Sequence, residues 1–372
     1  MGLHSEIEFG ERKLLIESSF YPEQRTIVSN VFDDGHLVEK REWALSADLP
    51  DHELSERLEE CHRRMTAEYE ILEYIQKKIR TVSHPPSNNR LGLVFLAKGL
   101  YREALREFTV AIKGDPGKAE YYGNLARALL ALGRPEDALS AVDEGLERGP
   151  NFADLHNLRG LVLLRLDRHA DAVKAFQEAV QYNPSYGEAH LNLALSLLAT
   201  VRQNMEHPDL PPVLTRIRKA LASVKQAVEA SPVLDPAEAE PVFEAVKLQD
   251  LARAERLIEA LRAKLPSPES LLYDHEFYLQ FMYGGKGKDE EALQTYIQWL
   301  QEELQAHPEY PDLHNNLGVA YLIAARNLFT KAIDEFREAL RINPNFERAA
   351  KNLRLAQNDG KGFLILLRAV LK

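Results

Sequence analysis

The chain has almost no cysteine and no long apolar run, and both shortages restrict its class. Of 372 residues only Cys61 is a cysteine, so neither an internal disulfide nor a thiolate zinc site can form. No apolar stretch approaches the roughly 20 residues of a membrane span. The start, MGLHSEIEFGERKLL, lacks the basic and apolar regions of a signal peptide, and Glu6 stands where myristoylation needs Ser or Thr. We therefore expect a cytoplasmic protein.

Positive charge is also in short supply. Lys and Arg number 46 against 57 for Asp and Glu, which gives a net charge of −11. Nucleic-acid-binding proteins usually carry a basic surface, so this balance argues against a nucleic-acid partner. Hydrophobic residues are 45% and charged residues 28% of the chain, an ordinary composition for a folded protein.

A period of 34 residues organises the middle of the chain. Small residues in one column let two helices approach closely, and a proline at the end of each period stops the second helix. Four columns share this period: Gly92, Ala126, Gly160 and Ala194; Ala104, Ala138 and Ala172; Phe108, Val142 and Phe176; and Pro116, Pro150 and Pro184.

The pattern resembles the tetratricopeptide repeat family. The stretch LGLVFLAKGLYREALREFTVAIKGDP carries the family's landmarks at Leu91, Gly92, Phe95, Ala104, Phe108, Ala111 and Pro116. The resemblance implies a mainly α fold, a right-handed α–α superhelix in which helix pairs stabilise one another by stacking. It also implies a non-enzymatic protein–protein interaction scaffold with a concave groove and no cofactor.

The repeats predict the division of the chain into domains. We expect four units in residues 85–234, with an insertion near 200–214, and two degenerate units in 235–310. Residues 311–346 carry a further regular unit whose inter-helix turn falls near Asn327, and 347–372 form a capping helix and an apolar tail.

The first 84 residues differ from the repeats and resemble no family known to us. Residues 1–47 are rich in β-branched and aromatic residues, and Asp33–Gly35 is a hairpin signal, so we expect a small antiparallel β module. Residues 48–84 have helical spacing of apolar side chains and predict a long connecting helix.

Motifs that would indicate catalysis or metal binding are incomplete. The loop YGGKGK ends at Lys288 before Asp289, where a phosphate-binding loop has Ser or Thr. The pair His275–Glu276 lacks the second histidine of a zinc helix, because Leu279 takes that place. Three histidines recur at one repeat position: His156, His190 and His314. They are too widely spaced to share a metal ion, so a role in packing explains them better. We expect no enzyme and no metal site.

One series of amides indicates a binding groove. In the family the first helix of each pair lines the concave face, and amide side chains can bind an extended peptide because they both donate and accept. The alternative is that asparagine is common at this position and only solvates the face. The predicted peptide-binding residues are Asn124, Arg127, Asn157, Leu161, Asn192, Leu195, Asn315, Asn316 and Val319.

We therefore expect a scaffold that holds a peptide or helix of a protein partner in its groove. The apolar tail GFLILLRAVLK supports an alternative, a membrane-peripheral assembly adaptor, although the tail is too short to span a bilayer. The same tail could instead dock on the last repeat or mediate self-association.

Overall fold

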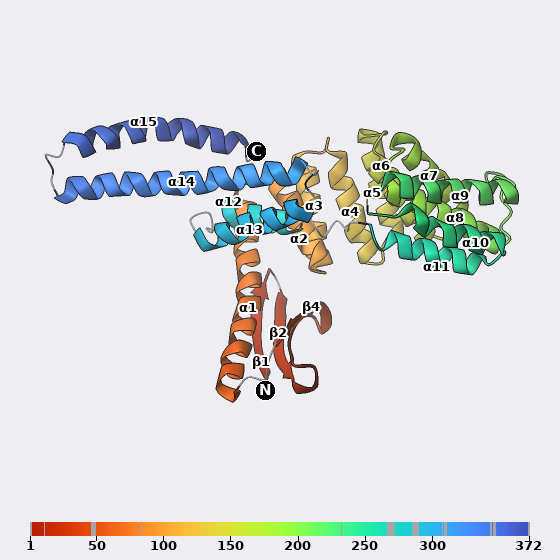
Figure 1. The fold of residues 1–372 in the computed structure, drawn as a ribbon, viewed down its shortest axis with the longest axis horizontal. Helices are drawn as coiled ribbons and strands as arrows, with labels where there is room; N and C mark the ends of the chain where they lie inside the picture. The colour runs from red at the N-terminus through yellow and green to blue at the C-terminus, as the bar shows by residue number, and fades with distance from the viewer. Residues whose placement is uncertain are drawn as a thin grey trace. The chain divides into compact units, whose positions relative to one another are not determined.

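The computed structural model is mainly helical with a four-stranded antiparallel sheet at the amino terminus, as predicted (Figure 1). It describes residues 2–10, 12–45, 50–82, 84–231, 233–265, 272–284, 290–306, 308, 311–342, 344 and 347–370. The chain divides into two compact units: an N-terminal unit, Met1–Thr66 with Ile79–His275, and a C-terminal unit, Ala67–Lys78 with Glu276–Lys372.

The amino-terminal sheet is a meander in which each strand pairs with the next. The hairpin expected at Asp33–Gly35 is present, and Asp34 and Gly35 have the positive φ values, 47° and 79°, that such a turn requires. The strands are β1 (Gly2–Phe9), β2 (Arg12–Tyr21), β3 (Thr26–Asp33) and β4 (His36–Ala44), with a 3₁₀ turn at Pro22–Gln24 between β2 and β3.

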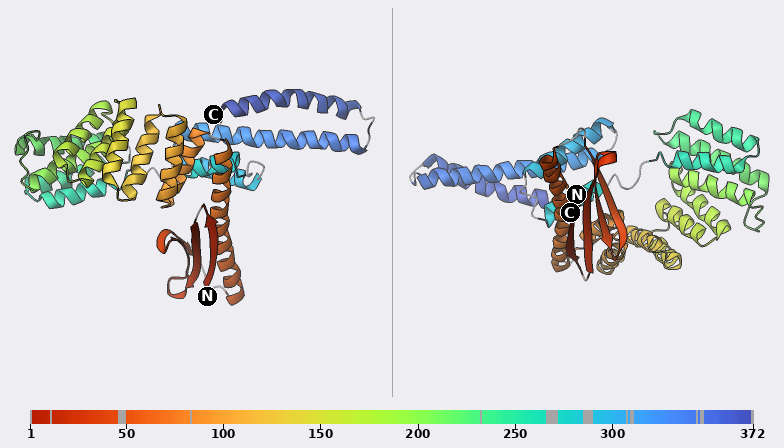
Figure 2. Two further views of the ribbon diagram at one scale, coloured as in Figure 1. Left: turned by 180° about the vertical axis from the view of Figure 1, so that it is seen from behind. Right: turned by 90° about the horizontal axis from the view of Figure 1, so that it is seen from below.

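The predicted connecting helix is α1 (Asp51–Val82), and its first half lies along one face of the sheet (Figure 2). Leu58 and Cys61 of α1 are buried against Ile27 of β3. His62 of α1 is buried against β1 and β2: its Nε2 lies 2.8 Å from the Ser5 hydroxyl and its Nδ1 2.9 Å from the Ser18 hydroxyl. The sheet therefore gains from α1 the apolar cover that a small sheet needs.

The same sheet also docks on the first repeat. The Arg12 guanidinium binds the carboxylates of both Asp33 on β3 and Glu103, which is 4% exposed. The rings of Phe9 and Phe95 meet edge to face with centroids 5.7 Å apart. The β module thus covers the first helix pair at the amino-terminal end of the array, an end that a repeat protein must protect from water.

Four regular helix pairs follow. In each, the second helix buries its small and bulky landmark residues against the first helix, as the repeat columns predict. The connection 203–212 between the last two of these helices contains the expected insertion. The pairs are α2 (Pro85–Ala97) and α3 (Tyr101–Gly114), α4 (Ala119–Ala131) and α5 (Pro135–Arg148), α6 (Ala153–Arg165) and α7 (His169–Tyr182), and α8 (Gly187–Arg202) and α9 (Val213–Ala230).

The first degenerate unit packs differently from its predecessors. A 3₁₀ turn, η2 (Pro236–Ala239), leads into α10 (Glu240–Lys247), which has only 8 residues, and then α11 (Leu251–Arg262). Helix α11 packs directly on α8, the first helix of the preceding repeat, as well as on α10. Because α10 is too short to cover α8 itself, the second helix of this unit takes that place. Pro266, expected to close the unit, lies outside the described residues.

The C-terminal unit contains most of α12 (Leu272–Met282), together with α13 (Glu290–Ala306), α14 (Pro311–Ile342) and α15 (Glu347–Val370). The turn predicted near Asn327 is absent, because α14 runs through it as one helix of 32 residues. No proline follows Pro311 within this helix, and the residues around Asn327 are mostly good helix formers. The predicted tail likewise continues α15 to Val370 rather than turning back at Gly362, and the side chains from Phe363 onward lie outside the described residues.

Candidate functional site

A hollow lies on the N-terminal unit, between α8, the first helix of the fourth repeat, and α11. Its volume is about 600 Å³, and its floor is formed by apolar side chains with one wall of alternating charge. The apolar floor residues are Leu164, Leu195 and Ala199, and the residues around them are Ser196, His169, Asn192, Ala252, Glu255, Arg256, Glu259 and Arg262.

Ion pairs fix most of the charged wall in place. Nε of Arg202 on α8 lies 3.0 Å from both carboxylate oxygens of Glu255 on α11, and Arg262 pairs with Glu259 at 2.6 Å. Arg256 is exposed and makes no ion pair or hydrogen bond within the described part of the chain. Its guanidinium is therefore available to a carboxylate that enters the hollow.

Amide pairs connect the first helices of neighbouring repeats. Nδ2 of Asn124 donates to Oδ1 of Asn89, and Nδ2 of Asn192 donates to Oδ1 of Asn157, both at 2.9 Å. Asn124 and Asn192 are each 2% exposed. Partners 35 residues apart lie on adjacent first helices, so each pair links one repeat to the next.

Arginine and tyrosine side chains complete both amide pairs. Nη1 of Arg127 donates to Oδ1 of Asn124 at 2.7 Å, and Nη1 of Arg262 donates to Oδ1 of Asn192 at 3.1 Å. Nδ2 of Asn157 donates to the Tyr186 hydroxyl at 3.3 Å, and burial raises the pKa of Tyr186. A ligand could reach these amides only by displacing hydrogen bonds that they already make.

The remaining predicted groove residues are distributed over both units. Leu195 lines the hollow, and Leu161 is half-buried against the same apolar core. Asn315, Asn316 and Val319 lie on α14 of the C-terminal unit, where Asn315 is exposed.

Sequence reasoning missed Asn89, Arg256 and Arg262. The spacing of 35 residues from Asn89 to Asn124, repeated from Asn157 to Asn192, was a usable signal for the amide pairs. Nothing in the sequence placed α11 beside α8, so neither arginine could be assigned to the hollow.

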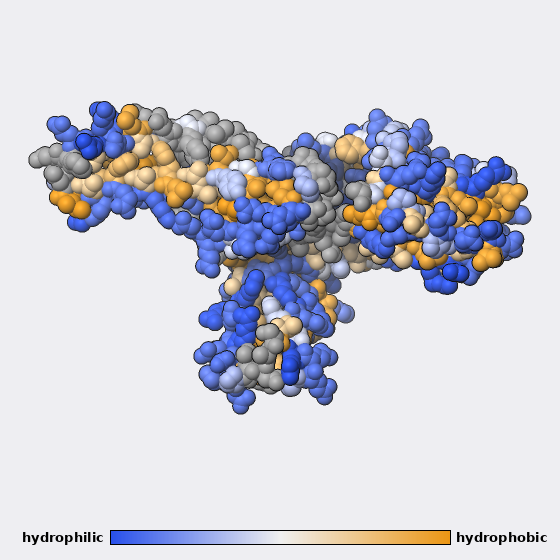
Figure 3. Space-filling model, in the orientation of Figure 1, coloured by the Kyte–Doolittle hydropathy of each residue, from blue (hydrophilic) through white to orange (hydrophobic). Residues whose placement is uncertain are grey.

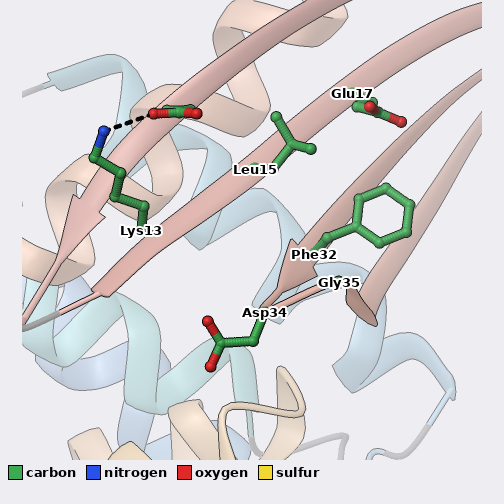
Figure 4. A pocket seen from close by; sticks show the side chains of 7 residues that line it. Lys13, Leu15, Glu17, Phe32, Asp34 and Gly35 are labelled. Atoms are coloured by element: carbon green, nitrogen blue, oxygen red, sulfur yellow. Dashed lines mark hydrogen bonds and ion pairs between the residues drawn. The ribbon is translucent and has the colours of Figure 1, made fainter.

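A second hollow of about 310 Å³ lies on the sheet face opposite α1 (Figure 4). Leu15 and Phe32 form its apolar part, and Nζ of Lys13 lies 2.7 Å from the Glu6 carboxylate at its edge. The hydrogen bond from Lys13 lowers the pKa of the exposed Glu6 carboxyl. Glu17 and Asp34 also line this hollow, so its lining is net acidic, whereas acidic and basic side chains balance in the hollow between α8 and α11.

No three His, Cys, Asp or Glu residues gather at a metal-binding distance among the described side chains. None of the described helices is both long and apolar enough to cross a lipid bilayer. Two of the recurring histidines serve packing: Nε2 of His156 and His190 lies 2.8 Å and 2.9 Å from the carbonyl oxygens of Pro150 and Pro184, whereas His314 makes the same contact with Pro308 at 3.1 Å but is exposed. The side chains of His156 and His190 are buried.

Comparison with known families identifies the helix pairs. One tetratricopeptide repeat model matches residues 95–162, and a second matches 157–203 and 286–345. The chain contains tetratricopeptide repeats. No family matches the amino-terminal module, and no curated protein matches the sequence. Proteins of this repeat family bind proteins or peptides and are generally non-enzymatic scaffolds.

Solved structures of other repeat proteins are similar in part. A Pseudomonas aeruginosa protein, PilF, is 17% identical with a TM-score of 0.37, over 62% of this chain and 95% of its own. A thermophilic repeat protein of Thermus thermophilus is 21% identical with a TM-score of 0.37, over 54% and 100%. YrrB, described as having an unusual peptide-binding site, is 17% identical with a TM-score of 0.36, over 55% and 98%.

Proposed function

We propose that this protein is an interaction scaffold that binds an extended segment of a protein partner in the hollow between α8 and α11. The observation that supports this most directly is the combination of an apolar floor with an unpaired arginine, Arg256. Ligand sites typically combine apolar walls with a few polar groups that fix orientation. A segment with an apolar side chain beside an acidic one fits this arrangement.

The amide pairs have a supporting role in this proposal. They join the first helices whose side chains form the groove, and Arg262 ties the last pair to α11. A site held in shape before binding loses less conformational entropy when its ligand arrives. Asn192 and Asn157 would then act by positioning the floor, and direct contact with a peptide would be secondary.

Selection from a random-peptide display library over the immobilised full-length chain yields a peptide probe directly, so the natural partner need not be identified first. Affinities of the selected peptides are then measured for the wild type and for Arg256→Glu. Reversal of the Arg256 charge should lower the affinity for an acidic peptide by about tenfold or more.

Arg253→Glu is the matched control, because Arg253 is an exposed arginine on the same helix and does not line the hollow. It should leave affinity within about twofold of wild type, since an exposed charge outside the contact contributes little. Equal weakening by both variants would indicate a general charge effect, and no weakening by Arg256→Glu would place the site elsewhere.

A further inference from the structure

The last repeat has the sequence of a helix pair and the structure of a single helix. In the first and third repeats a glycine of the first helix faces a phenylalanine of the second. A Cβ built at Gly92 would lie 2.5 Å from the Phe108 ring, and one at Gly160 the same distance from Phe176. The corresponding glycine in α14 is Gly318, and no atom of the described residues lies within 4 Å of a Cβ built there.

The phenylalanine that fits Gly318 is in the same helix but out of its reach. Phe336 lies 18 residues further along α14, which at 1.5 Å per residue is about 27 Å. Ala332, Phe336 and Ala339 are only half-buried. The corresponding residues of the first, third and fourth repeats are all fully buried: Ala104, Phe108, Ala111, Ala172, Phe176, Ala179, Ala220, Val224 and Ala227.

Further apolar side chains on this segment face solvent. Leu328 is 60% exposed and Ile342 is 73% exposed. Figure 3 shows hydrophobic residues along α14, between hydrophilic ones. A contiguous apolar surface of this kind in a folded protein indicates an interaction site.

Asn327 keeps the signature of a turn although α14 continues through it. It stands five residues before Ala332. In the first, second, third and fifth repeats the residue five before the equivalent alanine has positive φ: Gly99 74°, Gly133 70°, Asp167 56° and Gln249 60°. After glycine, asparagine is among the residues that adopt this left-handed conformation most readily. The sequence at Asn327 is therefore compatible with both a closed helix pair and an open continuous helix.

Gly318 and Phe336 lie nine residues on either side of Asn327. Two α14 helices paired antiparallel, with a twofold axis at Asn327, would place each Gly318 opposite the partner's Phe336. We propose that a second copy of this chain occupies the open site, and that the two copies exchange residues 328–342. Each copy then completes the last repeat of the other.

The exchanged contact is self-complementary, as a twofold interface requires. It reproduces contacts that the first and third repeats make within one chain, and exchange of identical elements is a low-cost route to dimers. Four of the six charged side chains on the exchanged segment are already paired within it, with Asp334 2.9 Å from Arg337 and Glu338 2.6 Å from Arg341, and Lys331 pairs with Glu290 of α13. Close approach of two such helices therefore brings few unpaired charges together.

The mass of the full-length chain in solution, measured by light scattering, tests this proposal. The wild type should have twice the monomer mass of 42.2 kDa. Gly318→Leu blocks the receiving site and Phe336→Glu spoils the donated segment, so each variant alone should be monomeric. An equimolar mixture of the two should form a heterodimer, because one intact site and one intact segment remain. Circular dichroism confirms that each variant is folded.

Two further variants make the result specific to the exchange. Gly318→Ala should remain dimeric, because Ala126 and Ala194 occupy the same position in the second and fourth repeats. Asn327→Gly favours the turn and should shift the protein toward the monomer, with Phe336 folded back on its own Gly318. A monomeric wild type, a dimeric Gly318→Leu, or a mixture that stays monomeric would each overturn the proposal.

Discussion

The ring of Phe176 lies directly against the backbone of Gly160, with Cε1 only 2.5 Å from where a Cβ would stand. Real Cβ atoms do not approach a ring so closely, so the third repeat depends on glycine at this position. The same relationship joins Gly92 to Phe108. The second and fourth repeats have alanine at this position, Ala126 and Ala194, so the two helices of those repeats leave room for a methyl group.

Gly160→Leu should lower the free energy of unfolding by about 1–3 kcal/mol, because the new side chain must displace the Phe176 ring in a packed core. Urea denaturation followed by circular dichroism measures this. Gly362→Leu is a control, since Gly362 is a helical glycine with no described atom within 4 Å of its Cβ position. If Gly160→Leu unfolds like the wild type and like the control, then the contact between Gly160 and Phe176 does not restrict the side chain at position 160.

Loss of an amide pair should lower the free energy of unfolding. Asn192→Ala leaves Oδ1 of buried Asn157 without its donor and Nη1 of Arg262 without its acceptor, which should cost about 1–3 kcal/mol. The double variant Asn157→Ala and Asn192→Ala should cost less than the sum of the two single variants, because the residues share one interaction. Asn315→Ala, at an exposed position, should change stability by less than about 0.5 kcal/mol. Additive effects would contradict the pairing.

Arg12→Ala should destabilise the contact between the β module and the first repeat. Burial raises the pKa of the Glu103 carboxyl, and the Arg12 guanidinium opposes that rise. Removal of one partner from a buried ion pair typically costs about 3–5 kcal/mol. Arg102→Ala removes an exposed pair with Asp34 at 3.5 Å and should cost less than about 1 kcal/mol. Equal thermal stability of the two variants would argue against the buried role of Arg12.

Acid should weaken the fold through buried histidines. Burial lowers the pKa of His190 and His62 below the value of about 6.5 that an unfolded chain has. Below that pH the unfolded state binds more protons, so the stability present at higher pH is lost as pH falls through about 6.5. His190→Gln should reduce this slope in melting temperature measured against pH, since glutamine can still donate to the Pro184 carbonyl without titrating. An unchanged slope would assign the pH dependence to other groups.

The sequence predicted the regular repeats well because each is specified locally. Small residues such as Gly160, and the prolines that stop the helices, act within one helix pair and recur in every copy. The hairpin at Asp33–Gly35 and the long helix α1 were predicted for the same reason.

Features that depend on competition between packing arrangements could not be predicted. The sequence at Asn327 carries the signal of a turn, yet it is also compatible with a helix, and the structure has the helix. Placement of α11 on α8 depends on the shortness of α10 and has no local signal. Asn124, Asn157 and Asn192 lie on first helices, but their burial depends on amide partners 35 residues away in the chain.

The amide pairs connect the first repeat to the second and the third to the fourth, but not the second to the third. Across that middle joint, Nε of Arg159 contacts Asp143 at 2.7 Å near the surface, and apolar packing does the rest. Local opening of a folded protein begins where its connections are weakest. In hydrogen-exchange measurements the array should therefore open as two blocks of two repeats each. The boundary between fast-exchanging and slow-exchanging amides should fall at the joint between α5 and α6.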